Sequence, residues 1–321
     1  MAVQSALSKI GAGKQSGKGS AGTLTYAHGL ADGAIMSVDV QQALADITSG
    51  ARVAPGVDRT AVMSGVDFSS RVHAASAGLW LYAALGAIST TGTTPKSHAI
   101  TVGTDTPYLT TFGSLDSNYY SVQDVKVGDL GLSWDGNEAL QMSVSGMGTV
   151  LGFPASFSAT TDNTHAAYFR PAGGTFKIDV DTDTPATAAV VSGEVTIANN
   201  ISEVMLSGTI TPNDIVNGRT EVECSFDIVP SNLADWRTIV TGAADGSSAA
   251  SAPVYGSFEC VFTDGTYSLT VAASRVAFTC DFPASDPAGG AVTLSLAGLC
   301  TQPAAGGTPL TVTLTNAVSS Y

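Results

Sequence analysis

The sequence contains few charged residues and, above all, few basic ones. Charged residues make up 12% of the 321 positions, about half the usual quarter, and 13 Lys plus Arg stand against 27 Asp plus Glu. The net charge of −14 disfavours a protein that grips phosphates with a basic face, because each such contact needs a cation. The hydrophobic content of 44% nevertheless excludes a disordered chain.

Long apolar runs are also missing. The longest, residues 77–88 (AGLWLYAALGAI), is shorter than the roughly 20 residues needed to cross a bilayer, and it predicts one buried helix. The first 20 residues carry three lysines but no apolar core, so we expect no secretory signal peptide and a protein that is made in the cytoplasm.

The four cysteines lack a metal-binding pattern. No C-x-x-C pair or neighbouring pair of histidines occurs, which argues against a zinc site. Cys224, Cys260 and Cys280 each alternate with apolar residues, as inward-facing strand positions do. They are therefore predicted to be buried and unreactive.

Signatures of catalysis and of cofactor binding fail on inspection. The segment GAGKQSGKGS departs from the phosphate-loop pattern, because Ala12 takes the place of the first glycine and Gly19 follows Lys18. The pattern G-x-S-x-G is absent, and the histidines are scattered. We predict no enzyme, no cofactor and no metal, although a catalytic triad assembled only in three dimensions stays open as an alternative.

One acidic segment imitates a calcium loop. Asp179, Asp181 and Asp183 occupy alternate positions, as the first three ligands of such a loop do. Thr184 replaces the turn glycine and Val190 the bidentate glutamate, so a solvated strand end is the better interpretation, with a chance divalent ion as the alternative.

Strand signals fill most of the chain. Many segments alternate apolar and polar residues, and Gly and Pro turns separate them, which predicts a mainly β fold. Residues 76–86 and 231–242 instead show helical spacing, each between a possible serine cap and a glycine. Trp80 and Trp236 fall on these helices as expected core residues, whereas Trp134, beside a hairpin turn, is the one tryptophan expected to be exposed.

The most informative feature is a repeat with a slowly drifting offset. Gly33 and Gly193 lie 160 residues apart, and Phe68 and Phe226 lie 158 apart. A series of matches in the same order predicts a tandem duplication; the other matched pairs are Ser49-Gly50 with Ser207-Gly208, Arg59-Thr60 with Arg219-Thr220, Trp80 with Trp236, Gly86-Ala87 with Gly242-Ala243, and Gly146-Met147 with Gly298-Leu299.

The repeat divides the chain into parts. We predict a flexible basic N-terminal arm over residues 1–25, a first module over 26–150, a linker over 151–174 and a second module over 175–321. Each module contains a connection of about 20 residues, 41–64 and 199–218, which we interpret as inter-subunit contact loops.

Three segments carry a resemblance to a known family. They are GVDFSSRVHAASAGLWLYAALG (65–86), YYSVQDVKVGDLGLSWDGNEALQMSVSGMG (119–148) and LSGTITPNDIVNGRTEVECSFDIV (206–229). Their order, a strand leading to a short helix and then a strand pair, resembles the tail tube (major tail) proteins of long flexible-tailed, siphovirus-type bacteriophages, in a duplicated two-module form. The resemblance extends from about residue 25 over nearly the whole chain.

The resemblance implies a fold and an assembly. Each module would be a β-sandwich or barrel with one short flanking helix, and modules would form stacked rings around a bore through which double-stranded DNA leaves the capsid. With two modules in one chain, a trimer would form a pseudo-sixfold ring, and a hexamer remains the other possibility. The tape measure, terminator and distal tail proteins would be partners, and the protein would be part of the virion tail, assembled in the host cytoplasm.

The acidic composition fits such a bore, because like charge lets DNA slide without sticking. Candidate residues for the lumen are Asp124, Asp129, Glu138, Glu194 and Glu223. Candidates for the subunit interface are Arg59 and Arg219, expected at equivalent places after the long connections, with Asp58 and Asp214.

Three alternatives remain at this point. Another ring-forming phage protein, such as a decoration or terminator subunit, would also be small and rich in β structure. A β-sandwich adhesin or carbohydrate-binding protein would need an export signal or an aromatic groove, and an enzyme would need a hidden catalytic constellation.

Overall fold

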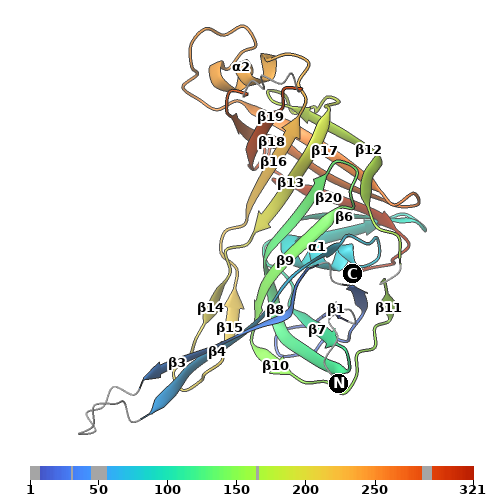
Figure 1. Cartoon of the computed structure of the whole chain (residues 1–321), viewed down its shortest axis with the longest axis vertical. Coiled ribbons are helices and arrows are strands. Elements are labelled where there is room, and N and C mark those ends of the chain that lie inside the picture. Colours follow the sequence, from blue (N-terminus) through green and yellow to red (C-terminus); the bar gives the residue numbers. More distant parts are fainter. Residues whose placement is uncertain (1–7, 30–31, 45–55, 164–165, 284–290) are drawn as a thin grey trace.

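The computed structural model describes residues 8–29, 32–44, 56–163, 166–283 and 291–321. Strands dominate these residues and two short helices accompany them, which confirms the mainly β fold class. Figure 1 shows two layers of strands in an elongated molecule, with two β-hairpins projecting from one end and a helix at the other.

One layer, which we call the inner sheet, runs through both halves of the chain. Its order is β3–β4–β9–β8–β13–β16–β19–β18, and every neighbouring pair is antiparallel. The strands are β3 (Asp32–Leu44), β4 (Val57–Arg71), β8 (Asn118–Asp135), β9 (Gln141–Gly148), β13 (Val190–Ala198), β16 (Glu221–Ile228), β18 (Ser268–Cys280) and β19 (Leu294–Cys300).

The other layer, the outer layer, is built from shorter strands and from the first parts of β8 and β18. One group is β11–β2–β1–β7–β8–β10 and the other is β12–β17–β18–β20–β6–β5. The strands are β1 (Lys9–Lys14), β2 (Tyr26–Gly29), β5 (Gly86–Thr91), β6 (Lys96–Val102), β7 (Leu109–Leu115), β10 (Val150–Gly152), β11 (Thr161–Asp162), β12 (Arg170–Asp179), β17 (Tyr255–Thr263) and β20 (Thr311–Asn316).

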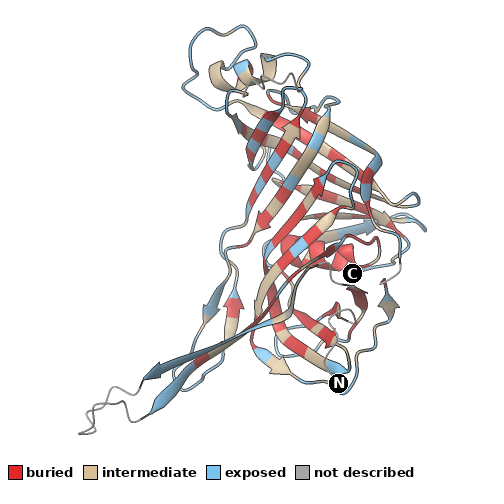
Figure 2. Ribbon diagram, viewed as in Figure 1, coloured by how far each residue is buried: buried red, intermediate tan, exposed pale blue. Residues whose placement is uncertain are grey.

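The core lies between the two layers, as the buried residues in Figure 2 show. Trp134 is part of it, with its ring 4.9 Å from that of Phe262 and 5.7 Å from that of Phe176, which corrects the prediction that this tryptophan is exposed. Space for the ring exists because Gly193 pairs with Trp134 across the sheet, where a Cβ would come within 2.5 Å of the indole.

The two predicted helices exist and end at glycines. α1 (Ala77–Leu85) and α2 (Ala234–Thr241) are followed by Gly86 and Gly242, both in the left-handed conformation that glycine adopts easily. Ser76 precedes α1 without a side-chain cap, and α2 begins after Leu233, so the predicted serine caps are wrong. α1 is buried between the layers, whereas α2 lies at the end of the molecule with its Trp236 half-buried.

The two long connections of the sequence are projecting hairpins rather than irregular loops. In the first, β3 and β4 pair as far as Leu44 and Val57, and residues 45–55 lie outside the described part. The second carries β14 (Ser202–Val204) and β15 (Asp214–Val216). The two hairpins lie side by side (Figure 1). The Val62 N–H on β4 donates a hydrogen bond of 2.6 Å to the Ile210 carbonyl, which lies between β14 and β15.

Part of the predicted N-terminal arm forms a paired strand. β1 lies between β2 and β7, and Ile10 and Ala12 are fully buried. Glycine at positions 11 and 13 marks close backbone packing here, because a Cβ on Gly13 would clash with the Thr23 carbonyl. Residues 1–7 lie outside the described residues, and the predicted linker 151–174 contains β11 and the start of β12.

Both halves of the chain show the same order of pairing. In the first, β3–β4–β9–β8 are neighbours, with β7 and β10 flanking β8; in the second, β13–β16–β19–β18 are neighbours, with β17 and β20 flanking β18. The registers agree as well: Gly33 pairs with Phe68 as Gly193 pairs with Phe226.

Candidate functional site: an acidic sheet face and two free edges

One face of the inner sheet packs on the core, and the opposite face, which we call the open face, is polar. The alternation along β16 illustrates this: Val222, Cys224 and Phe226 are buried, whereas Glu221, Glu223 and Ser225 are exposed. Because directly paired residues share a face, the register assigns the other strands too. The open face carries the acidic residues Asp39, Asp67, Asp129, Asp135, Glu194, Glu221, Glu223 and Asp227.

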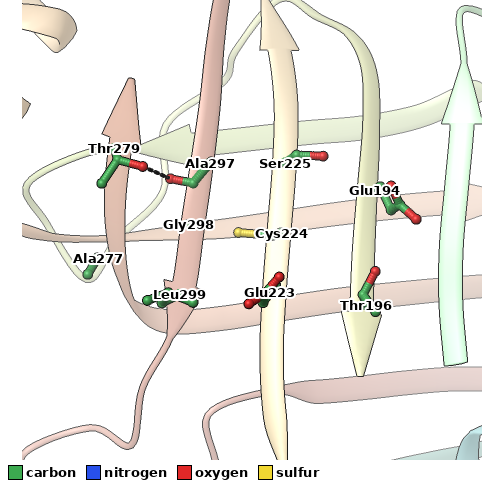
Figure 3. Close-up of a pocket in the computed structure, with 10 residues that line it drawn as sticks. All are labelled: Glu194, Thr196, Glu223, Cys224, Ser225, Ala277, Thr279, Ala297, Gly298 and Leu299. Atoms are coloured by element: carbon green, nitrogen blue, oxygen red, sulfur yellow. Dashed lines mark hydrogen bonds between the residues drawn. The ribbon is translucent and has the colours of Figure 1, made fainter. Parts of the chain in front are cut away.

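Small hydroxyl side chains separate these carboxylates. Asp227 accepts hydrogen bonds from Ser192 on one neighbouring strand and Ser295 on the other, and Ser145 donates to Asp129 over 3.0 Å. Figure 3 shows the same composition over β13, β16 and β19, where Glu194 and Glu223 stand among serine, threonine and alanine. The face is therefore acidic and polar, and Arg71 is a basic side chain on it.

The structure divides the predicted lumen residues. Asp129, Glu194 and Glu223 lie on the open face. Glu138 lies in the turn between β8 and β9.

Asp124, the remaining lumen candidate, is buried in the outer layer, and its role there is to hold the segment 15–22. Its carboxylate accepts the Gly19 N–H at 2.7 Å and the Thr149 hydroxyl at 2.8 Å, so Asp124 is a buried residue that lies away from the open face.

The predicted interface residues do not form one group. Asp58 and Arg59 lie on the exposed part of β4, and Arg219 is exposed before β16 with Glu221 as its neighbour at 3.9 Å. Relative to the matched residues Phe68 and Phe226, Arg219 corresponds to position 61, so the two arginines are not at equivalent places.

Asp214, the last predicted interface residue, anchors a projecting hairpin. It lies 2.9 Å from the ammonium of Lys18 and accepts the Tyr108 hydroxyl at 2.9 Å. Burial, and then this hydrogen bond, raise the pKa of Tyr108, which therefore stays a neutral donor. The hairpin β14–β15 is thus tied to residues of the first half.

The inner sheet ends in two free edges within the described chain. β3 pairs with β4 alone, and the last residues of β18, from Phe278 on, pair with β19 alone. Apolar side chains are exposed beside both edges: Val38 is 45% exposed on β3, and Phe282, which packs on Trp236, is 65% exposed after β18. Unpaired strand edges of this kind are templates for another strand.

Sequence reasoning missed the side chain that connects the two halves. Asn199 is fully buried, and its amide donates to the Ala84 carbonyl at 2.8 Å and the Val127 carbonyl at 3.0 Å. Its side-chain oxygen accepts the Thr220 hydroxyl at 2.8 Å. The only sequence signal was an asparagine directly after an alternating strand, which is usually a turn residue.

Within the described residues we find no catalytic centre. They contain no group of three or more His, Cys, Asp or Glu placed to hold a metal ion. Cys224 and Cys260 are buried, as predicted, and burial raises the pKa of the Cys260 thiol, which makes it unreactive. Cys280, at the end of β18 that pairs with β19 alone, is only half-buried, so the prediction that it is a buried residue is wrong. None of the helices in the described part has the length and apolar character to traverse a membrane.

A mainly β subunit with an acidic sheet face and unpaired edges has the features of a structural, assembling protein. The chain matches the family model of phage tail tube proteins over residues 5–315, and it belongs to that family. It is therefore a structural component of the virion tail. Among curated proteins, none matches this chain.

Proposed function

We propose that copies of this chain close their inner sheets into rings that stack into the tail tube, with the open face lining a passage for double-stranded DNA. The observation that carries this proposal is the open face itself. Eight acidic side chains spread over a continuous sheet, with hydroxyl groups between them, repel phosphates and keep the surface wet. The inner sheet has free edges on both sides, so closure across subunits would leave no edge exposed.

The chain is proposed to be a tandem duplication that forms trimeric, pseudo-sixfold rings. Support comes from the identical pairing order of the two halves and from the register shared by Gly33–Phe68 and Gly193–Phe226. Because β8 of the first half already pairs with β13 of the second, two halves of one chain occupy consecutive positions in a sheet.

Contacts between rings are proposed for the two projecting hairpins, β3–β4 and β14–β15. Arg59 with Asp58 on the first, and Arg219 beside the second, are exposed charges that would pair across a subunit boundary. Tape measure, terminator and distal tail proteins would bind at the ends of the tube, and assembly would precede release from the host cytoplasm, as in siphovirus-type tails.

Electron microscopy of the purified protein tests this function directly. Hollow cylinders or rings with a central hole are expected, and three-fold symmetry with six similar lobes would establish the trimer. A monomer at all concentrations, or solid particles, would refute the proposal.

Charge reversal on the open face tests which surface lines the hole. Tubes of the Glu194→Lys/Glu223→Lys variant are expected to retain short linear duplex DNA in a salt-sensitive way, whereas wild-type tubes do not. Asp181→Lys/Asp183→Lys, which changes two exposed carboxylates in the turn after β12, is the control with the same change in net charge. Equal retention by both variants would show that the open face is not the lumen.

A further inference from the structure

The contact between the halves of one chain, which we call the internal junction, shows what covers the edges of this sheet. In it β8 pairs with β13, so that Leu130 lies opposite Ile197 and Leu132 opposite Val195. All four side chains are buried there, at 1% exposure or less. The internal junction is thus an apolar seam between two strands whose outer face is acidic.

Register identifies the residues that correspond to this seam at the free edges. Leu130 pairs with Val144 of β9, and Cys280 pairs with Leu296 of β19. Val144 and Leu296 correspond to each other, because each lies two residues before one of the matched glycines, Gly146 and Gly298. Cys280 therefore corresponds to Leu130, and Phe282, two residues later, corresponds to Leu132.

The same comparison works for the opposite edge. Ile197 pairs with Val222, four residues before Phe226, and Val38 pairs with Ser64, four residues before Phe68. Val38 thus corresponds to Ile197, and its neighbour Val40 corresponds to Asn199. The side chains exposed at the free edges, Val38, Val40 and Phe282, occupy the positions that are buried in the internal junction.

We infer that the edge of β18 in one copy pairs with β3 of the next copy in the register of the internal junction, which places Cys280 opposite Val38 of that copy. This inference rests on the proposed function, and it specifies the surface that joins the chains. The partner is a second copy of this chain, because the internal junction shows the same two edges already joined. The contact is head to tail, so it can continue around a ring.

One substitution distinguishes the junction between copies from the internal one. Asn199 satisfies the Ala84 carbonyl at the end of α1, whereas the corresponding Val240 carbonyl of α2 already accepts the Ala250 N–H at 3.0 Å. The Val240 carbonyl therefore needs no hydrogen-bond donor from the next copy of the chain, and the apolar Val40 of that copy can stand at the position that Asn199 takes in the internal junction. The Thr220 partner of Asn199 is likewise replaced by Val62, which pairs with Val40.

A single cysteine tests the register, because the native Cys280 supplies the other thiol. Val38→Cys, oxidised with diamide during assembly, is expected to give covalent multiples of the 32.3 kDa chain on a denaturing gel under non-reducing conditions. Val38→Cys/Cys280→Ser removes one thiol, and Asp39→Cys places the thiol on the other face of β3; both should stay monomeric. The ratio of cross-linked to monomeric chain is expected to be at least ten times higher for Val38→Cys than for either control.

Several outcomes are informative. Tubes without cross-linking by Val38→Cys, or equal cross-linking by Asp39→Cys, would overturn the inferred register while the proposed function stands. Cross-linked rings that never stack would support the register and refute the tube. Should Val38→Cys not fold, Phe282→Asp in the wild-type background gives a second test, because it is expected to yield folded monomers that do not assemble, and normal assembly would refute the contact.

Discussion

Replacing Asn199 by alanine measures what the internal junction contributes to the stability of the chain. The buried amide makes two donor contacts and one acceptor contact, to Ala84, Val127 and Thr220. Each hydrogen bond contributes about 1 kcal/mol net, and removal leaves the partners buried without a replacement. The free energy of unfolding is therefore expected to fall by about 3 kcal/mol. Thr220→Val removes one of the three contacts and should cost about 1 kcal/mol.

Urea unfolding followed by tryptophan fluorescence is the appropriate assay, because Trp80 and Trp134 lie in the core of the two halves. With a slope of about 3 kcal/mol per molar urea, Asn199→Ala should lower the midpoint by about 1 M and Thr220→Val by about 0.3 M. The protein is kept dilute so that assembly does not contribute. A shift for Asn199→Ala no larger than that for Thr220→Val would refute the argument that this amide joins the halves.

Two further predictions concern buried polar groups. Burial lowers the pKa of His28 from 6.5 to about 4, so the unfolded chain takes up a proton that the folded chain refuses, and stability is lost as the pH falls. Between about pH 7.5 and pH 5 the free energy of unfolding should fall by about 2 kcal/mol from this group, and a His28→Gln variant with the same pH dependence in urea titrations would contradict this. Asp124→Ala removes the acceptor of the Gly19 N–H, and faster trypsin cleavage at Lys14 and Lys18 is expected; unchanged cleavage would show that segment 15–22 is held by other contacts.

The mainly β class, the two helices and the matched positions could be predicted because each depends on local pattern. Phe68 and Phe226 stand in alternating strands, and Gly86 and Gly242 end helical segments, so the signal lies within a few neighbouring residues. The structure places Phe68 and Phe226 opposite Gly33 and Gly193, the glycines matched from the sequence alone.

Features that depend on distant residues could not be predicted. The glycine-rich segment around Lys14 has a flexible composition, yet β1 is ordered because β7, about 100 residues later, pairs with it. Trp134 adjoins a turn sequence and is buried only because Gly193 of another strand leaves room for the indole. The sequence places Asp124 among the candidate lumen carboxylates, and only the fold shows that a backbone N–H and a hydroxyl group donate to its buried carboxylate.

The pairing of β8 with β13 also affects how assembly responds to the amount of protein. In the proposed ring of three chains, every second seam forms as a single polypeptide folds, at the high effective concentration that a covalent connection provides. Two diffusional encounters then join the three chains of a ring, whereas six separate halves would need five, and each encounter avoided spares the loss of translational and rotational freedom. Polymer formation should accordingly begin at a lower protein concentration than it would for separate halves.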